Sequence, residues 1–248
     1  MPPAGGPAAR IGGTTAPWED PLSSQPPAAV LFDMDGTLVD SEKLWDVALY
    51  ELAAEYGGRL SEEARLAMVG SSMADSMEIL HADLAQPWRD PAVSAAWIDD
   101  RIVELFRTGL PWRPGASALL RAVRAAGLPT ALVTSSGRRL VEIALDTLGR
   151  DSFDVVVCGD EVEATKPHPE PYLTAARLLG VPIDRCVAIE DSPTGVASAL
   201  AAGAAVLAVP AEVPVQAADG VHLRETLDGV DLAVLAALLR PPTAPPAG

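Results

Sequence analysis

The alternation of short apolar runs with helical patterns is the feature that most constrains the fold of this chain. Five runs are typical of strands: Ala29–Phe32, Thr130–Val133, Val155–Cys158, Cys186–Ile189 and Ala205–Val209. They are unbroken rather than alternating in polarity, as in a sheet covered on both faces. Helical patterns that end near glycines precede the last four runs: Ala116–Ala126, Arg139–Leu148, Pro171–Leu179 and Thr194–Ala202. We therefore expect an α/β fold with a Rossmann-like, doubly wound parallel sheet.

The segment between the first two predicted strands is too long for an ordinary connection. It shows only helical periodicity, over Leu44–Tyr56, Glu62–Val69, Ala74–Leu80 and Val93–Phe106. Such an insertion predicts a separate helical bundle that can close over a site at the sheet edge. We therefore predict a cap domain over 43–110 and a core formed by 28–42 and 111–240. The ends, 1–27 and 241–248, are rich in Pro and Ala and are predicted to be disordered.

The overall charge argues against several classes of partner. The chain of 248 residues has a formal net charge of −16 at pH 7, whereas nucleic acids and anionic membranes require basic surfaces. No apolar run approaches the roughly 18 residues of a membrane span, and no signal-peptide pattern is present. The two cysteines, Cys158 and Cys186, fall on predicted buried strands. We expect a reduced, cytoplasmic protein, a monomer or weak homodimer, that binds a small molecule.

The first predicted strand leads directly into Asp33-Met34-Asp35-Gly36, which places two carboxylates in one small volume. Such a pair repels unless a cation lies nearby, and hard oxygen ligands favour Mg²⁺. An Asp in this position can also act as a nucleophile while its neighbour transfers protons. Asp-Gly after a strand is also an ordinary turn signal, so the motif alone leaves both interpretations open.

Two later motifs end strands of the same predicted sheet. Thr134-Ser135-Ser136-Gly137 follows the second strand and predicts either a phosphate cradle or a plain helix N-cap. Glu190-Asp191 ends the fourth strand. Because ligands of open α/β sheets bind at the carboxyl ends of the strands, these carboxylates should converge with those of the first strand. Four carboxylates in one place require a divalent cation.

A lysine in a rigid loop completes the set of candidate residues. Lys166 is one of only two lysines among the 18 basic side chains, the other being Lys43. Three prolines between Thr165 and Pro171 fix an extended loop around it. A compact ammonium in a chain that otherwise uses arginine suits a role beside a phosphate and an attacking carboxylate.

In sequence order, these motifs resemble the four motifs of the haloacid dehalogenase superfamily of phosphohydrolases. The first is Asp33-Met-Asp-Gly-Thr-Leu-Val-Asp40, and the resemblance covers residues 28 to 240. It implies a Mg²⁺-dependent phosphatase in which Asp33 forms an aspartyl-phosphate. In that mechanism Asp35 protonates the leaving alcohol and then activates water.

The same resemblance implies roles for the remaining motif residues. The substrate phosphate is expected to bind Ser135, Ser136 and Lys166, with Thr134 as the alternative hydroxyl. The expected Mg²⁺ ligands are Asp33, the backbone carbonyl of Asp35, Asp191, and Glu190 either directly or through water.

Within the superfamily, the segment Asp40-Ser-Glu-Lys-Leu-Trp-Asp46 is similar to that of sugar-phosphate phosphatases. The nearest alternative is a phosphomutase like β-phosphoglucomutase, in which a histidine occupies the position of Trp45 and an arginine that of Met73. Both departures favour a phosphatase, because no obvious clamp for a second phosphate remains. A regulatory protein on an inactive scaffold would lack one of the motif residues, and all are present here.

Overall fold

A six-stranded, fully parallel sheet forms the centre of the molecule. The computed structural model describes residues 25–68 and 71–239, so most of the predicted N-terminal extension and the whole predicted tail lie outside the described residues. The strand order is β3-β2-β1-β4-β5-β6, with the strands β1 (Ala29–Phe32), β2 (Thr130–Val133), β3 (Val155–Val157), β4 (Cys186–Glu190), β5 (Ala205–Ala208) and β6 (Val221–Leu223).

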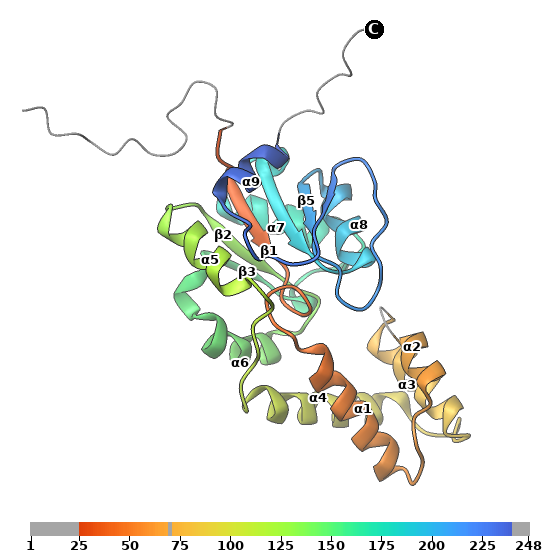
Figure 1. Cartoon of the computed structure of the whole chain (residues 1–248). Coiled ribbons are helices and arrows are strands. Elements are labelled where there is room, and N and C mark those ends of the chain that lie inside the picture. Colours follow the sequence, from red (N-terminus) through yellow and green to blue (C-terminus); the bar gives the residue numbers. More distant parts are fainter. Residues whose placement is uncertain (1–24, 69–70, 240–248) are drawn as a thin grey trace, which may run out of the picture.

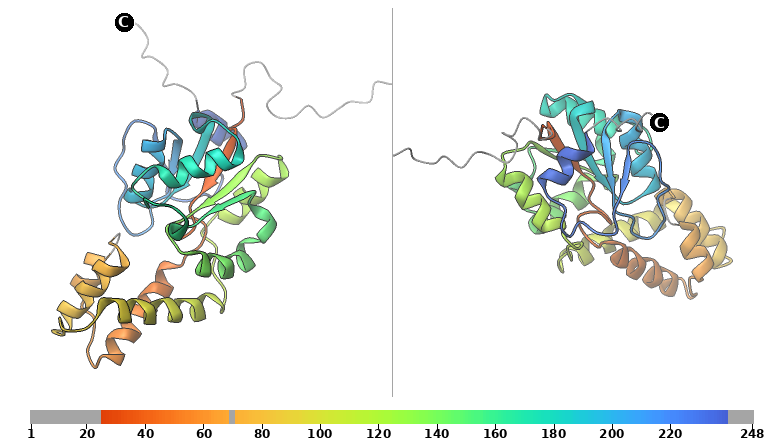
Figure 2. Two further views of the ribbon diagram at one scale, coloured as in Figure 1. Left: turned by 180° about the vertical axis from the view of Figure 1, so that it is seen from behind. Right: turned by 45° about the horizontal axis from the view of Figure 1, so that its top comes forward.

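Helices cover both faces of this sheet, which explains the unbroken apolar strands. On one face, Val30 and Phe32 share a hydrophobic cluster with α5 (Ala116–Ala125), α6 (Arg138–Leu148) and α9 (Leu232–Leu238). On the other, Leu31 packs with α7 (Glu170–Leu179) and α8 (Pro193–Ala202), which are seen from behind in Figure 2. Three short 3₁₀ segments complete the core: η1 (Arg150–Ser152), η2 (Gly159–Glu161) and η3 (Ile183–Arg185). The predicted doubly wound α/β fold is therefore confirmed.

The long insertion after β1 forms four helices that pack together beside the sheet edge (Figure 1). They are α1 (Glu42–Glu55), α2 (Glu62–Met68), α3 (Met73–Asp83) and α4 (Pro91–Phe106). The two connections to the core run side by side, since the N–H of Asp40 donates to the carbonyl of Pro111 at 2.8 Å. The insertion therefore begins and ends close to the carboxyl end of β1. The predicted helical bundle is confirmed as an element of the fold.

One strand and one α-helix were missing from the prediction, as were the short 3₁₀ segments, and several boundaries differ from it by a few residues. Strand β6 is only three residues long at the sheet edge, and its His222 and Leu223 are exposed, so no apolar run announces it. Helix α9 is uniformly apolar over seven residues and shows no helical periodicity. Strand β4 continues through Glu190, and Val69, predicted to end a helix, lies outside the described residues.

Candidate active site

The site is built at the carboxyl ends of three neighbouring strands. Phe32 pairs in register with Leu132 of β2 and with Ile189 of β4. Asp33 follows β1 directly, and its N–H donates to the carbonyl of Ile189 at 3.0 Å. Because the strands are parallel and in register, the residues that follow them, Thr134 and Asp191, lie beside Asp33 at the same edge. The topology therefore brings the first, second and fourth motifs together.

Lys166 enters this cluster from the loop between η2 and α7. Its Nζ donates to Oδ1 of Asp33 at 2.7 Å, to Oε1 of Glu190 at 2.6 Å and to the carbonyl of Val133 at 2.9 Å. These three acceptors use all three N–H bonds of the ammonium. Burial alone would lower the pKa of Lys166, but the carboxylates of Asp33 and Glu190 outweigh it and raise that pKa. Lys166 is therefore a fixed, permanently charged cation between two motifs.

Three carboxylates form a cluster that could hold a metal ion. Oxygens of Asp33, Glu190 and Asp191 lie within 4.8 Å of one another, and all three residues are buried. Oδ2 of Asp33 is the one buried side-chain oxygen or nitrogen in the described part of the chain without a hydrogen-bond partner. Burial, reinforced by Asp33 and Glu190, raises the pKa of Asp191 to about 9. Buried, mutually repelling hard oxygens suit a divalent cation such as Mg²⁺.

Glu190 differs from the other two carboxylates because donors already surround it. Oε1 accepts from the hydroxyl of Tyr172 at 2.6 Å as well as from Lys166, and Oε2 accepts from the N–H of Asp191 at 3.3 Å and from Oγ of Ser192 at 3.4 Å. Gly195 is required here, because a Cβ on it would collide with the Glu190 carboxylate. Glu190 therefore has little capacity left for a direct metal bond.

Asp35 is held apart from this cluster by hydroxyl groups. Its Oδ1 accepts from Oγ of Ser41 at 2.6 Å, and its Oδ2 accepts from Oγ of Ser136 at 2.7 Å. Burial raises the pKa of Asp35, and the nearby charge of Asp33 raises it further, although the two serine hydroxyls oppose the shift. The carboxyl is thus oriented by fixed partners and holds a proton more readily than an exposed aspartate. This is the behaviour expected of a proton donor.

The three hydroxyl residues after β2 occupy different environments. Thr134 is buried, and its Oγ1 lies 3.5 Å from Oδ2 of Asp35 while accepting the N–H of Ser136 at 3.0 Å. Ser136 contacts Asp35 directly, whereas Ser135 is exposed. Thr134 and Ser136 are therefore bound into the carboxylate network, and Ser135 is not.

Three polar residues that the sequence motifs did not indicate support the site. Ser41 at the start of α1 binds Asp35, Thr37 donates from Oγ1 to Oδ1 of Asp191 at 3.2 Å, and Tyr172 binds Glu190. All three are fully buried. Tyr172 could have been predicted from the sequence, because a tyrosine on the buried face of a helix needs a hydrogen-bond partner for its hydroxyl. Ser41 and Thr37 showed no pattern that separates them from turn residues.

A cavity of about 280 Å³ lies between the inserted helices and the core. Its walls come from all four inserted helices and from the loop after β5, and comprise Glu42, Trp45, Leu49, Arg65, Met68, Ser71, Met73, Ser76, Met77, Ile98 and Glu212. Burial, reinforced by Glu212, raises the pKa of Glu42 to about 7.

Comparison with known proteins agrees with this architecture. A family model described as haloacid dehalogenase-like hydrolase matches residues 27–203. The chain belongs to the haloacid dehalogenase-like hydrolases. Hexitol phosphatase A of Escherichia coli K12 is 36% identical over 187 residues, which cover 74% of this chain and 84% of the relative. A probable pseudouridine-5'-phosphatase of Drosophila melanogaster is 34% identical, with 73% of this chain and 80% of the relative covered.

Solved structures of the family have the same arrangement. The structure of CbbY from Rhodobacter sphaeroides in complex with phosphate has a TM-score of 0.72 and 29% identity, and the match covers 84% of this chain and 99% of that one. A putative β-phosphoglucomutase from Thermotoga maritima has a TM-score of 0.66 and 28% identity, with coverages of 85% and 97%. Together with the phosphatase relatives, the family match makes this chain a phosphoric monoester hydrolase. No helix in the described part is long and apolar enough to cross a membrane.

Proposed function

We propose that the chain is a Mg²⁺-dependent phosphatase that hydrolyses a small phosphorylated metabolite, a sugar phosphate, through an aspartyl-phosphate on Asp33. The observation that carries the proposal is the asymmetry of Asp33: Oδ1 is held by Lys166, while Oδ2 is buried without a partner. An oxygen in that condition is oriented and unsolvated, as a nucleophile in an enzyme site should be. The hexitol and pseudouridine phosphatase relatives support the substrate class.

The proposed reaction has two steps. Oδ2 of Asp33 attacks the phosphorus in line, the bond to the leaving oxygen breaks, and Asp35 gives that oxygen its proton. A water molecule then attacks the phosphorus of the aspartyl-phosphate, loses its proton to Asp35, and releases inorganic phosphate and free Asp33. Ser41 and Ser136 hold the Asp35 carboxyl in place for both transfers.

The basic and hydroxyl groups of the site bind the transferring phosphoryl group. Lys166 neutralises charge on its oxygens, and Ser135, Ser136 and Thr134 are the candidate hydroxyl donors. Asp33, Asp191 and the carbonyl of Asp35 would hold Mg²⁺, with Glu190 contributing through water because its own oxygens are already bonded. When bound, the ion supplies charge neutralisation for the phosphoryl oxygens.

We also propose that residues 43–110 form a cap over a core of 28–42 and 111–240. A phosphatase is preferred to a phosphomutase because Trp45 and Met73 line the cavity at the cap and neither can bind a second phosphate.

Cys158 and Cys186 are both buried and unpaired, which supports a reducing compartment such as the cytoplasm.

Phosphate release from a panel of sugar monophosphates, with Mg²⁺ and with EDTA, tests the proposal. We expect Mg²⁺-dependent release, and reduction of quenched enzyme with borohydride should convert phosphorylated Asp33 to homoserine. No release from any phosphoester, or unmodified Asp33 during turnover, would contradict it. An NMR time course with β-glucose 1-phosphate and a sugar bisphosphate tests the alternative phosphomutase activity. A phosphomutase would accumulate glucose 6-phosphate before free phosphate.

A further inference from the structure

Glu42 lies between the cavity beside the inserted helices and the carboxylate cluster of the core. Glu42 lines the cavity. A Cβ added to Gly36 would collide with the carboxylate of Asp191 and would lie 3.2 Å from Oε1 of Glu42. Glu42 and Asp191 are therefore both neighbours of Gly36. A substrate whose phosphate sits at Asp33 would therefore extend its remaining atoms past Glu42 into this cavity.

The charged residues that line the cavity do not form a binding site for a second anionic group of the substrate. Arg65 is the cation among the lining residues that the structure describes, and only 8% of it is exposed. Its Nη2 donates to both carboxylate oxygens of Glu212, at 2.8 and 3.0 Å, and its Nε donates to Asp46. The guanidinium is thus already neutralised by two carboxylates, one on α1 and one on the loop after β5. The described residues that line the cavity therefore offer a ligand no unpaired positive charge, and Arg113, whose charge acts on Glu42, is not among them.

The remaining lining groups are carboxylates, hydroxyls and apolar surfaces. Glu42 and Glu212 offer carboxylate oxygens, and Ser71 and Ser76 offer hydroxyls. Trp45 together with Met68, Met73 and Met77 provides flat or adaptable apolar contact. Carbon-bound hydroxyls can donate to the carboxylates while C–H groups pack on the tryptophan. A carboxylate or a second phosphate would face like charge instead.

We propose that this cavity selects an uncharged, hydroxyl-rich leaving group and rejects substrates that carry a second anionic group. The inference rests on the proposed phosphatase function and adds its substrate specificity. Glu42 and Glu212 are the specificity-determining residues. Arg65 is a positioning residue that links the inserted helices to Glu212 of the core and is not a phosphate ligand.

Two substrates that differ at one carbon test the proposal. Glucitol 6-phosphate and 6-phosphogluconate share the phosphate and most of the chain, but the second ends in a carboxylate instead of a hydroxymethyl group. We expect kcat/KM of the native enzyme with Mg²⁺ to be on the order of 10-fold or more lower for 6-phosphogluconate, because the carboxylates of Glu42, Glu212 and Asp46 outnumber the single cation Arg65 that pairs with them. Equal values, or a preference for 6-phosphogluconate, would overturn the proposal without any variant being needed.

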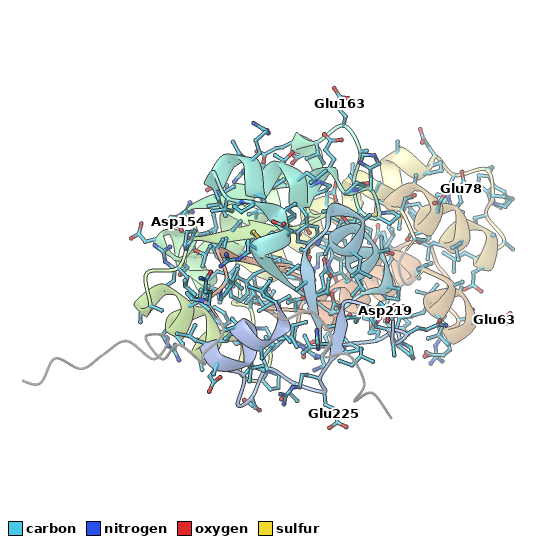
Figure 3. All side chains as sticks on the ribbon, turned by 90° about the horizontal axis from the view of Figure 1, so that it is seen from above. Glu63, Glu78, Asp154, Glu163, Asp219 and Glu225 are labelled. Carbon is cyan, nitrogen blue, oxygen red and sulfur yellow. The ribbon has the colours of Figure 1, made fainter. Side chains whose placement is uncertain are left out.

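A variant in which a neutral amide replaces one cavity carboxylate tests whether that carboxylate causes the discrimination between the two substrates. Glu212→Gln removes one cavity carboxylate and leaves Arg65 with Asp46 alone, so the ratio of the two kcat/KM values should fall several-fold. Glu63→Gln makes the same charge change on the exposed face of α2, at the outer edge of the molecule in Figure 3, and should leave the ratio unchanged. A folded Glu212→Gln enzyme with the native ratio would refute the role of Glu212.

A third substrate separates this inference from the proposed function. p-Nitrophenyl phosphate has a good leaving group and no hydroxyl chain to place in the cavity. Its Mg²⁺-dependent hydrolysis, with no discrimination between the other two substrates, would leave the phosphatase function standing and refute the specificity. No hydrolysis of any of the three would refute both.

Discussion

Lys166 and Asp33 are 133 positions apart in the sequence, and Nζ of Lys166 lies 2.7 Å from Oδ1 of Asp33. The pair is buried, with 4% and 8% of the two side chains exposed. A buried ion pair is favourable only when other partners satisfy its remaining hydrogen bonds. Glu190 and the Val133 carbonyl do so for Lys166, whereas Oδ2 of Asp33 has no partner. One oxygen of Asp33 is therefore fixed and the other is left for chemistry.

Replacing Asp33 by Asn is expected to abolish turnover, because the amide cannot attack phosphorus. The fold should be retained or slightly stabilised, since one of three clustered carboxylates is neutralised. Mg²⁺-dependent phosphate release and thermal unfolding measure the two effects. Asp219→Asn, an exposed site (Figure 3), is the matched control and should behave as the native enzyme. Near-native turnover by Asp33→Asn would end its assignment as nucleophile.

Asp35→Asn should lower kcat by on the order of 10²-fold or more for alkyl phosphates, which depend on a proton for the leaving group. The loss in the first step should be smaller for p-nitrophenyl phosphate, whose leaving group needs no proton. Single-turnover kinetics with both substrates report that step separately. An equal loss for both would argue that Asp35 acts by another route.

Lys166→Arg is expected to reduce turnover strongly although the charge is kept. A planar guanidinium cannot place its donors on Asp33, Glu190 and the Val133 carbonyl in the volume of an ammonium. The matched control is Lys43→Arg, because Lys43 is the other lysine and its side chain is 80% exposed. Full activity of Lys166→Arg would make the residue a structural cation of the loop.

Tyr172→Phe should weaken Mg²⁺ binding and raise the Mg²⁺ concentration that activity requires, because the hydroxyl orients Glu190. Loss of a partner behind a metal-site carboxylate costs roughly 10-fold in affinity. The Mg²⁺ concentration for half-maximal activity measures this effect, and Tyr50→Phe, at a 40% exposed tyrosine, serves as control. If that concentration is unchanged in Tyr172→Phe, the hydroxyl of Tyr172 has no role in Mg²⁺ binding.

The metal-free protein should lose stability as pH rises from about 4 to about 9. Burial raises the pKa of Asp191 from 3.8 to about 9, so in this window the folded chain holds a proton that the unfolded chain has released. The loss from this one group is at most about 1.4 kcal/mol per pH unit. Thermal unfolding in EDTA should show the slope, and Asp191→Asn should flatten it. Saturating Mg²⁺ should also remove it in the native chain. A slope unchanged by Asp191→Asn would exclude this residue as the cause.

Much of the candidate site could be predicted because its residues stand at the ends of strands. Asp33, Glu190 and Asp191 each follow or end an apolar run, and parallel strands place such residues at one edge. The hydroxyls were harder, since Thr134, Ser135 and Ser136 are equivalent in sequence. Only the path of the backbone after β2 turns Thr134 and Ser136 toward Asp35 and exposes Ser135.

The sequence by itself determined the parallel sheet, the helical insertion and the acidic edge, because each depends on local polarity patterns and on the order of elements along the chain. The tertiary structure alone decided which charges are free and which are paired. Nothing near Arg65 in the sequence indicates that Glu212, 147 residues away, occupies its guanidinium. Contacts between the insertion and the core join residues far apart in the sequence, and these contacts decide which charged groups line the cavity.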